Sequence, residues 1–279
     1  VQYSAIWGNP HITALFGVLY SIYFFLKLKK SNFKKKNYIY YSLFFLTLSA
    51  YIKQFYVFLF PFFLLIIFKK KITPIKIIIF LLALGLPGLI FLIENPVLLF
   101  GLSGLNITNF PSSILVCSTI IFVYLIPFIF QYFYNNPIIY RTLFSEILKR
   151  KVTIVITILI IFILNINFYY EGNIGGGLIY KFSNIILNNN YIFLISAFFG
   201  IYSLFYYSGD NIDNYFLSLL LLITFSNGFF IFQKYFEPMF FILLLAFYDK
   251  KRIEKSIMLG INWIIFYFTT YYLTLNFIY

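Results

Sequence analysis

Apolar runs separated by short polar stretches follow one another along the whole chain. Most are about 15 to 20 residues long, the length that an α-helix needs to cross a hydrocarbon core about 30 Å thick. The pattern predicts about ten membrane-spanning or half-spanning helices joined by short loops. Their expected ranges are residues 11–26, 38–52, 55–68, 75–93, 114–134, 152–168, 191–207, 215–232, 235–248 and 256–277.

These runs distinguish between the two kinds of structure that can span a membrane. Strands of a β-barrel alternate apolar and polar residues, because one face meets lipid and the other meets the lumen. The runs in this chain are apolar on all sides. The sequence therefore predicts an all-α fold: a polytopic integral membrane protein in which residues 1–279 form a single domain.

Composition agrees with this fold and excludes several kinds of site. Hydrophobic residues make up 62% of the chain and charged residues 10%, and the mean hydropathy is +0.91. A soluble domain carries about 25% charged residues. The single cysteine, Cys117, excludes an intramolecular disulfide. Because His11 is the single histidine, no metal site built from His and Cys ligands is expected.

The net charge of +13 is distributed unevenly between alternate loops. If the loops are assigned in turn to the two sides of a membrane, all but three of the 21 Lys and Arg residues fall on one side. The positive-inside rule makes that side cytoplasmic. Basic residues there would lie near anionic lipid headgroups, so membrane lipid and no nucleic acid is the expected partner. Lys53, Lys181 and Lys234 then lie on the exterior side, and we expect a bacterial or archaeal cytoplasmic membrane.

Two of the exterior lysines stand at the expected start of a helix that runs inward. Gln54 follows Lys53, and Gln233 and Tyr235 flank Lys234. The unpaired N–H groups and the positive dipole end of a helix N-terminus favour an anion. These residues are therefore candidates for holding the phosphate of a lipid-linked substrate. The alternative is that both lysines reach exterior water or ordinary phospholipid.

The exterior loops also hold the candidate acids. Glu94, Glu171 and Glu237 could each act as a general base or a metal ligand. No paired-carboxylate spacing occurs among them, so the residues alone do not assign the catalytic acid.

A glycine-rich stretch lies in the loop between the sixth and seventh predicted helices. Gly175, Gly176 and Gly177 lack the preceding strand and the spacing of a phosphate-binding loop. We expect them to form a close turn or to let the backbone approach a substrate. Lys181 follows in the same long loop.

Three stretches resemble segments of the C-type (GT-C) glycosyltransferases, a class of polytopic membrane enzymes. Residues 49–56, SAYIKQFY, are similar to the segment before a lipid-facing helix, in which the basic–Gln pair is usually Arg–Gln. Residues 233–238, QKYFEP, resemble an exterior turn near the end of many such enzymes. Residues 175–181, GGGLIYK, resemble a loop of bacterial members.

The resemblance implies an enzyme that takes a sugar from a polyprenyl-phosphate donor at the outer face of the membrane. The acceptor would be an envelope glycan, a lipid or a protein. In such enzymes basic residues hold the leaving phosphate, and this role falls on Lys53 and Lys234. An acidic residue in the first exterior loop deprotonates the acceptor or binds a divalent metal. No such loop is present, and the chain begins with Val1, so we expect a fragment whose first catalytic loop lies upstream.

Two other functions compete with this one. An envelope polysaccharide polymerase also works on polyprenyl-linked glycans, but its exterior loops would be expected to carry essential arginines, and no Arg is exterior here. A polytopic transporter or flippase is the non-enzyme alternative. Transporters often contain internal repeats and broken helices. No repeat is evident, and Pro87, between Gly85 and Gly88, is the candidate for a helix break.

Overall fold

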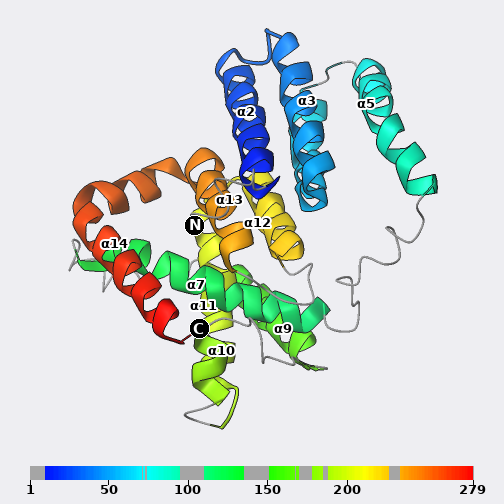
Figure 1. Ribbon diagram of the computed structural model, residues 1–279. Helices are drawn as coiled ribbons and strands as arrows, with labels where there is room; N and C mark the ends of the chain where they lie inside the picture. The colour runs from blue at the N-terminus through cyan, green and yellow to red at the C-terminus, as the bar shows by residue number, and fades with distance from the viewer. Residues whose placement is uncertain are drawn as a thin grey trace.

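The structure is a computed structural model, and it is helical throughout the part of the chain that it describes (Figure 1). It describes residues 10–70, 72, 74–94, 110–134, 151–166, 168–169, 178–184, 188–225 and 233–278. Each of the predicted apolar segments is helical over all or most of its described part, which confirms the all-α prediction for these residues.

The helices follow one another along the chain with short connections between most of them. In chain order they are α2 (Pro10–Lys30), α3 (Asn37–Ile52), the 3₁₀ helix η1 (Gln54–Phe58), α4 (Leu59–Lys69), α5 (Pro74–Glu94), α7 (Phe110–Tyr134), α9 (Lys151–Asn165), α10 (Leu178–Phe182), α11 (Tyr191–Tyr207), α12 (Ile212–Phe225), α13 (Gln233–Phe247) and α14 (Lys250–Ile278).

Three local predictions about these elements are wrong. The helix expected from residue 55 begins as a 3₁₀ turn and becomes α-helical only at Leu59. The charged stretch 249–255, expected to be a loop, is mostly the first part of α14, which bends at Gly260. Lys181, expected in a long loop, lies in the short helix α10. A charged or very short helix has no long apolar run, so hydropathy alone does not detect it.

Two of the described helices are long and apolar enough to cross a membrane, judged by length and composition. They are Ile12–Lys30 within α2 and Phe110–Ile129 within α7. The other apolar helical stretches that pass the same composition test, such as Pro74–Ile90 within α5, are shorter, at 10–17 residues. The structure thus confirms the helices but only part of the predicted set of full spans.

Helices α2 and α3 form a tightly paired hairpin (Figure 1). The hydroxyl of Ser21 donates to the carbonyl of Ser42 (2.7 Å), and the hydroxyl of Ser42 donates to the carbonyl of Ser21 (2.9 Å). Both serines are fully buried. Gly17 lies so close to Ser49 that a Cβ at residue 17 would be 2.2 Å from the serine hydroxyl. Small residues therefore allow the two backbones to approach each other closely.

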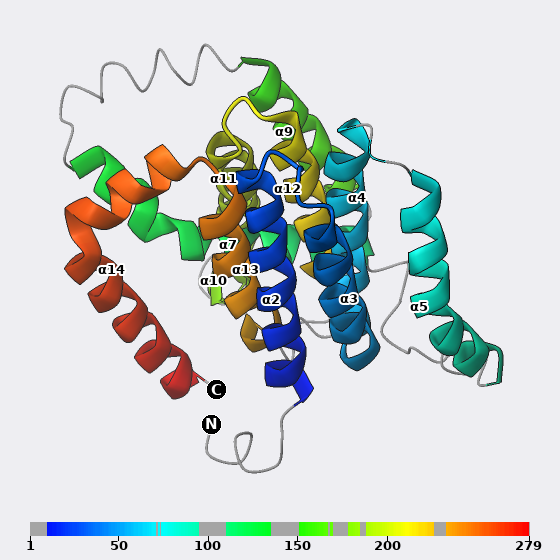
Figure 2. The ribbon, with the colours of Figure 1, turned by 90° about the horizontal axis from the view of Figure 1, so that it is seen from above.

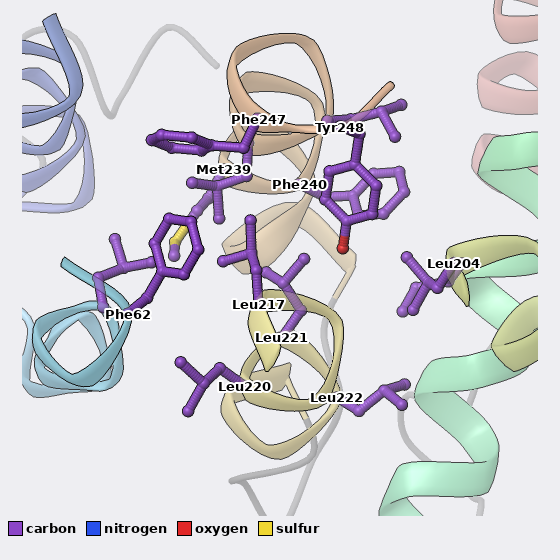
Figure 3. Close-up of a cluster of buried hydrophobic side chains, with 14 of the residues drawn as sticks. Phe62, Leu204, Leu217, Leu220, Leu221, Leu222, Met239, Phe240, Phe247 and Tyr248 are labelled. Carbon is purple, nitrogen blue, oxygen red and sulfur yellow. The ribbon is translucent and has the colours of Figure 1, made fainter. Parts of the chain in front are cut away.

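The apolar core includes side chains of α2, α3 and α7, and one cluster of it lies where α4, α11, α12 and α13 meet. Figure 3 shows Phe62 of α4, Leu204 of α11 and side chains of α12 and α13 lying close together. Phe62 is fully buried and its ring lies 5.0 Å from that of Phe247. Tyr248 brings a hydroxyl into this region, which interacts with the Ser218 hydroxyl at 2.8 Å. The core is thus mostly hydrocarbon, with its buried hydroxyl paired.

The helices at the periphery expose apolar side chains. On α5, Leu82 and Ile93 are 63% and 69% exposed, and on α9, Val152 and Phe162 are 72% and 68% exposed. Figure 2 shows α5 at one edge of the molecule and α14 at the opposite edge, with α2, α3 and α13 between them. A monomeric soluble protein rarely exposes large apolar patches of this kind.

Candidate functional site

Several charged residues gather where α2, α4 and α13 end and α12 begins, and we call this region the basic end. Lys69, the last residue of α4, forms an ion pair with Asp213 in the first turn of α12. Lys29, near the end of α2, lies 5.7 Å from the centre of the Phe247 ring at the end of α13. The exposed turn between α2 and α3 adds further lysines, namely Lys34, Lys35 and Lys36.

Lys53 lies far from the basic end, at the other end of α3. Its backbone is extended between α3 and η1; its N–H donates to the carbonyl of Ser49 (2.8 Å), and its carbonyl accepts from the N–H of Tyr56 (3.2 Å). The residue is half-buried. Since η1 and α4 together extend about 26 Å before Lys69, Lys53 belongs to the opposite end of the bundle. Gln54 begins η1, and its side chain is outside the described part.

Helix α13 also begins at this opposite end. Gln233, Lys234 and Tyr235 are its first three residues, and their side chains are outside the described part. Glu237 follows in the next turn and is half-buried. At 1.5 Å per residue it lies about 15 Å from Phe247 and hence from the basic end. Helix α13 therefore carries the predicted lysine and one predicted acid within about a turn of each other.

The Glu237 carboxyl lies beside the hydroxyl of Tyr124, which projects from α7. Tyr124 is fully buried, and no hydrogen bond of ideal geometry is made by its hydroxyl within the described part of the chain. The contact is thus electrostatic and looser than an ideal hydrogen bond. Tyr271 of α14 packs edge-on against Tyr124, with ring centres 6.3 Å apart. The carboxyl of α13 thus meets a tyrosine of α7, and α14 packs against the other side of that tyrosine's environment through Tyr271.

A second tyrosine fixes α14 beside α7 at this site. The hydroxyl of Tyr267 donates to the carbonyl of Val123 at 3.0 Å, one residue before Tyr124. The rings of Tyr267 and Tyr271 are stacked, with centres 6.4 Å apart. The position of Tyr124, and through it that of Glu237, therefore depends on α14.

The other predicted site residues do not join Glu237. Glu94 is exposed at the last residue of α5, which lies at the edge of the molecule away from α13 (Figure 2). Lys181 is half-buried in α10. The remaining candidates are outside the described residues, and they are Glu171, Gly175, Gly176 and Gly177.

Sequence reasoning did not identify Tyr124, Tyr267 or Tyr271. Tyrosine is abundant in this chain, with 26 residues, so an individual tyrosine in an apolar run carries no signal. Only the packing of α14 on α7 singles these three out.

The chemistry available at this site is that of a carboxyl supported by a phenol. A carboxylate can accept a proton from a substrate hydroxyl, and a nearby cation can stabilise a departing phosphate. Within the described residues, no group of three or more His, Cys, Asp or Glu side chains could hold a metal ion.

The chain matches no known protein family, no curated protein and no solved structure. Its function is therefore inferred from the chemistry of these residues and from the three stretches that resemble glycosyltransferase segments.

Proposed function

We propose that the protein is a polytopic membrane glycosyltransferase that moves a sugar from a polyprenyl-phosphate donor to an envelope glycan, lipid or protein acceptor. The membrane part of the proposal is supported by the apolar side chains that α5, α9 and α14 expose. Helix faces covered with apolar side chains are stable in contact with lipid. The basic end then faces the cytoplasm, and Lys53, Lys181 and Lys234 lie toward the exterior.

The single observation that carries the catalytic part is the first two turns of α13. Lys234 and Glu237 are three residues apart, a spacing that puts two positions on the same face of an α-helix. Glu237 is half-buried beside Tyr124. Ionisable residues inside a membrane are costly and usually serve a function.

The proposed reaction can be written step by step with these groups. An acceptor hydroxyl attacks the anomeric carbon of the sugar while its proton passes to the Glu237 carboxylate. The bond between that carbon and the phosphate oxygen breaks, and polyprenyl phosphate leaves with the electron pair. Lys234 and Lys53 stabilise the negative charge on the leaving phosphate.

The test is transfer of a radiolabelled sugar from a polyprenyl-phosphate donor to a membrane lipid extract, with the full chain in proteoliposomes. We expect Glu237→Gln to lower the transfer rate by about 10²- to 10⁴-fold, the usual contribution of a general base. Lys234→Ala should impair use of the donor. Lys76→Ala, at an exposed lysine near the start of α5, is the matched control and should retain the wild-type rate.

Two results would contradict the assignment. A Glu237→Gln variant that transfers sugar at the wild-type rate excludes Glu237 as the base. If Glu94→Gln abolishes transfer instead, the base is at the end of α5.

A transporter is the second candidate, and one feature favours it. Helices α5 and α14 are both interrupted, by Pro87 and at Gly260 respectively. Interrupted helices also occur in transporters. Accumulation of an unmodified lipid-linked sugar on one side of sealed vesicles, with no transfer product, would support this candidate over the enzyme.

A further inference from the structure

Helix α5 is held to the rest of the molecule by few buried contacts. It packs mainly on α3, and Figure 2 shows it at the edge of the bundle. Among its described side chains only that of Ile77 is buried. Few buried apolar contacts mean a low free energy for local opening. Helix α5 is therefore held in place largely by a small number of contacts with α3.

Pro87 interrupts the hydrogen bonds of this helix. Proline has no N–H, so the carbonyl of Ala83, four residues earlier, loses its helical donor, and the proline ring crowds the preceding turn. Kinks in long helices are usually found at such prolines. The part of α5 after Pro87 can thus change its angle relative to the part before it.

The hydroxyl of Tyr51 lies at this interruption. It donates to the carbonyl of Leu84, and it accepts from the N–H of Gly88 at 3.1 Å. Residues 84 and 88 are four apart, so these are the two groups that pair with each other in an uninterrupted α-helix. One side chain of α3 therefore contacts the backbone of α5 on both sides of Pro87.

The neighbouring glycines show how specific this contact is. A Cβ added at Gly88 would lie 2.6 Å from a ring carbon of Tyr51, so a larger residue at position 88 would push the ring away from the backbone. A Cβ added at Gly85 would have no neighbour within 4 Å. Gly88 therefore belongs to the contact, and Gly85 does not.

We propose that Pro87 is a hinge in α5 and that Tyr51 is the latch that holds the hinge closed against α3. When Tyr51 releases Leu84 and Gly88, the segment from Gly88 to Glu94 swings away from α3. The role of this opening rests on the proposed function: it admits the lipid chain of the polyprenyl-phosphate substrate. Tyr51 stands two residues before Lys53, the residue that stabilises the phosphate in that proposal.

The latch can be tested by distance measurements between spin labels, with the full chain in lipid nanodiscs. The buried Cys117 is first replaced by alanine, and labels are attached at Leu48 of α3 and Ile93 of α5, both exposed. Tyr51→Phe should broaden the distance distribution and lengthen it by about 3 Å, the displacement of residue 93 for a 20° swing at Pro87. A second label pair, Leu48 with Leu82, lies before the hinge and should be unchanged.

Three further variants make the test specific. Gly88→Ala should reproduce the effect of Tyr51→Phe, whereas Gly85→Ala, the matched control, should leave the distances unchanged. Pro87→Ala restores the missing N–H, so adding Tyr51→Phe to it should have no further effect. If Tyr51→Phe leaves the distance between residues 48 and 93 unchanged, or if its effect persists in the Pro87→Ala background, the latch is excluded.

Assays of sugar transfer distinguish this inference from the proposed function. Tyr51→Phe should change the KM for the polyprenyl-phosphate donor more than kcat, and Gly85→Ala should change neither. A wild-type protein that transfers no sugar would overturn the proposed function, while the distance measurements would still decide the latch. A normal KM in a Tyr51→Phe protein whose hinge is open would overturn the role in lipid entry.

Discussion

At the scale of single residues, the environment of Glu237 is the most informative feature of the site. The carboxyl is half-buried beside Tyr124, and aromatic rings of α13 and α14 surround that tyrosine, including Phe240 and Tyr271 at 5.8 Å and 6.3 Å between ring centres. Burying a carboxyl among apolar groups is unfavourable unless a polar partner compensates. Tyr124 is the polar partner that the described residues provide, so it should orient Glu237 without itself touching the substrate.

Replacing Tyr124 by phenylalanine tests this positioning role. Because the half-buried Glu237 carboxyl loses its polar partner, we expect a modest loss of stability, on the order of 1 kcal/mol. We expect the transfer rate to fall on the order of tenfold, because the carboxyl loses the group that orients it. Thermal unfolding and the transfer assay are measured on the same sample. Tyr191→Phe, at an exposed tyrosine, is the control. A large loss of stability with normal transfer would show a purely structural role.

At the scale of helices, close approach between backbones determines which pairs are rigid. Helices α7 and α11 meet at Gly200, where a Cβ would lie 1.9 Å from the carbonyl oxygen of Ser118. Helices α2 and α3 meet in the same way at Gly17. Helix α5 has no comparable contact along most of its length and is held to α3 mainly by Tyr51 at Leu84 and Gly88 and by the edge-on packing of Tyr40 on Phe80 at 5.0 Å between ring centres. The bundle thus combines tightly packed pairs with one loosely attached helix.

Gly200→Ala should separate α7 from α11. The added methyl group would meet backbone, which cannot rotate away, so we expect a loss of stability of roughly 1–3 kcal/mol. The measurement is the free energy of unfolding in mixed micelles, followed by far-ultraviolet circular dichroism. Gly85→Ala, where the methyl group meets open space, should leave stability unchanged or slightly raised. Equal stability of the two variants would contradict the close packing of α7 on α11.

At the scale of the whole molecule, charge divides the bundle into two ends. Lys69, Asp213 and Lys29 belong to one end, whereas Lys53 and the start of α13 belong to the other. The functional proposal depends on this division, because the basic end must be cytoplasmic for Lys53 and Glu237 to meet an exterior substrate.

Reaction of single cysteines with a membrane-impermeant maleimide in intact cells tests this orientation. In a Cys117→Ala background, Glu94→Cys at the end of α5 should react without permeabilisation. Asn37→Cys, at the start of α3 beside the lysine-rich turn, should react only after the cells are permeabilised. Both positions are exposed, so a difference in labelling reports the side of the membrane. Labelling of both from outside would contradict the orientation.

The sequence predicted helix positions well and tertiary pairings poorly. Apolar runs mark helices because lipid and the protein core both require apolar surfaces, and α11 has the predicted bounds. The contact of Tyr124 with Glu237 joins residues far apart in the chain, so no local pattern reports it. The same holds for the Tyr51 hydroxyl at Gly88. The first part of α14 was predicted as a loop because charged residues precede Gly260.

The pairing of α2 with α3 has a consequence for biosynthesis. Ser21 and Ser42 are 21 residues apart, and the turn between the helices is closed by its own hydrogen bonds, including one from the N–H of Phe33 to the carbonyl of Leu28 (3.0 Å). Contacts this local form quickly and need no later part of the chain. The hairpin can therefore form as a unit while the ribosome is still making α7, and the later helices can assemble against it.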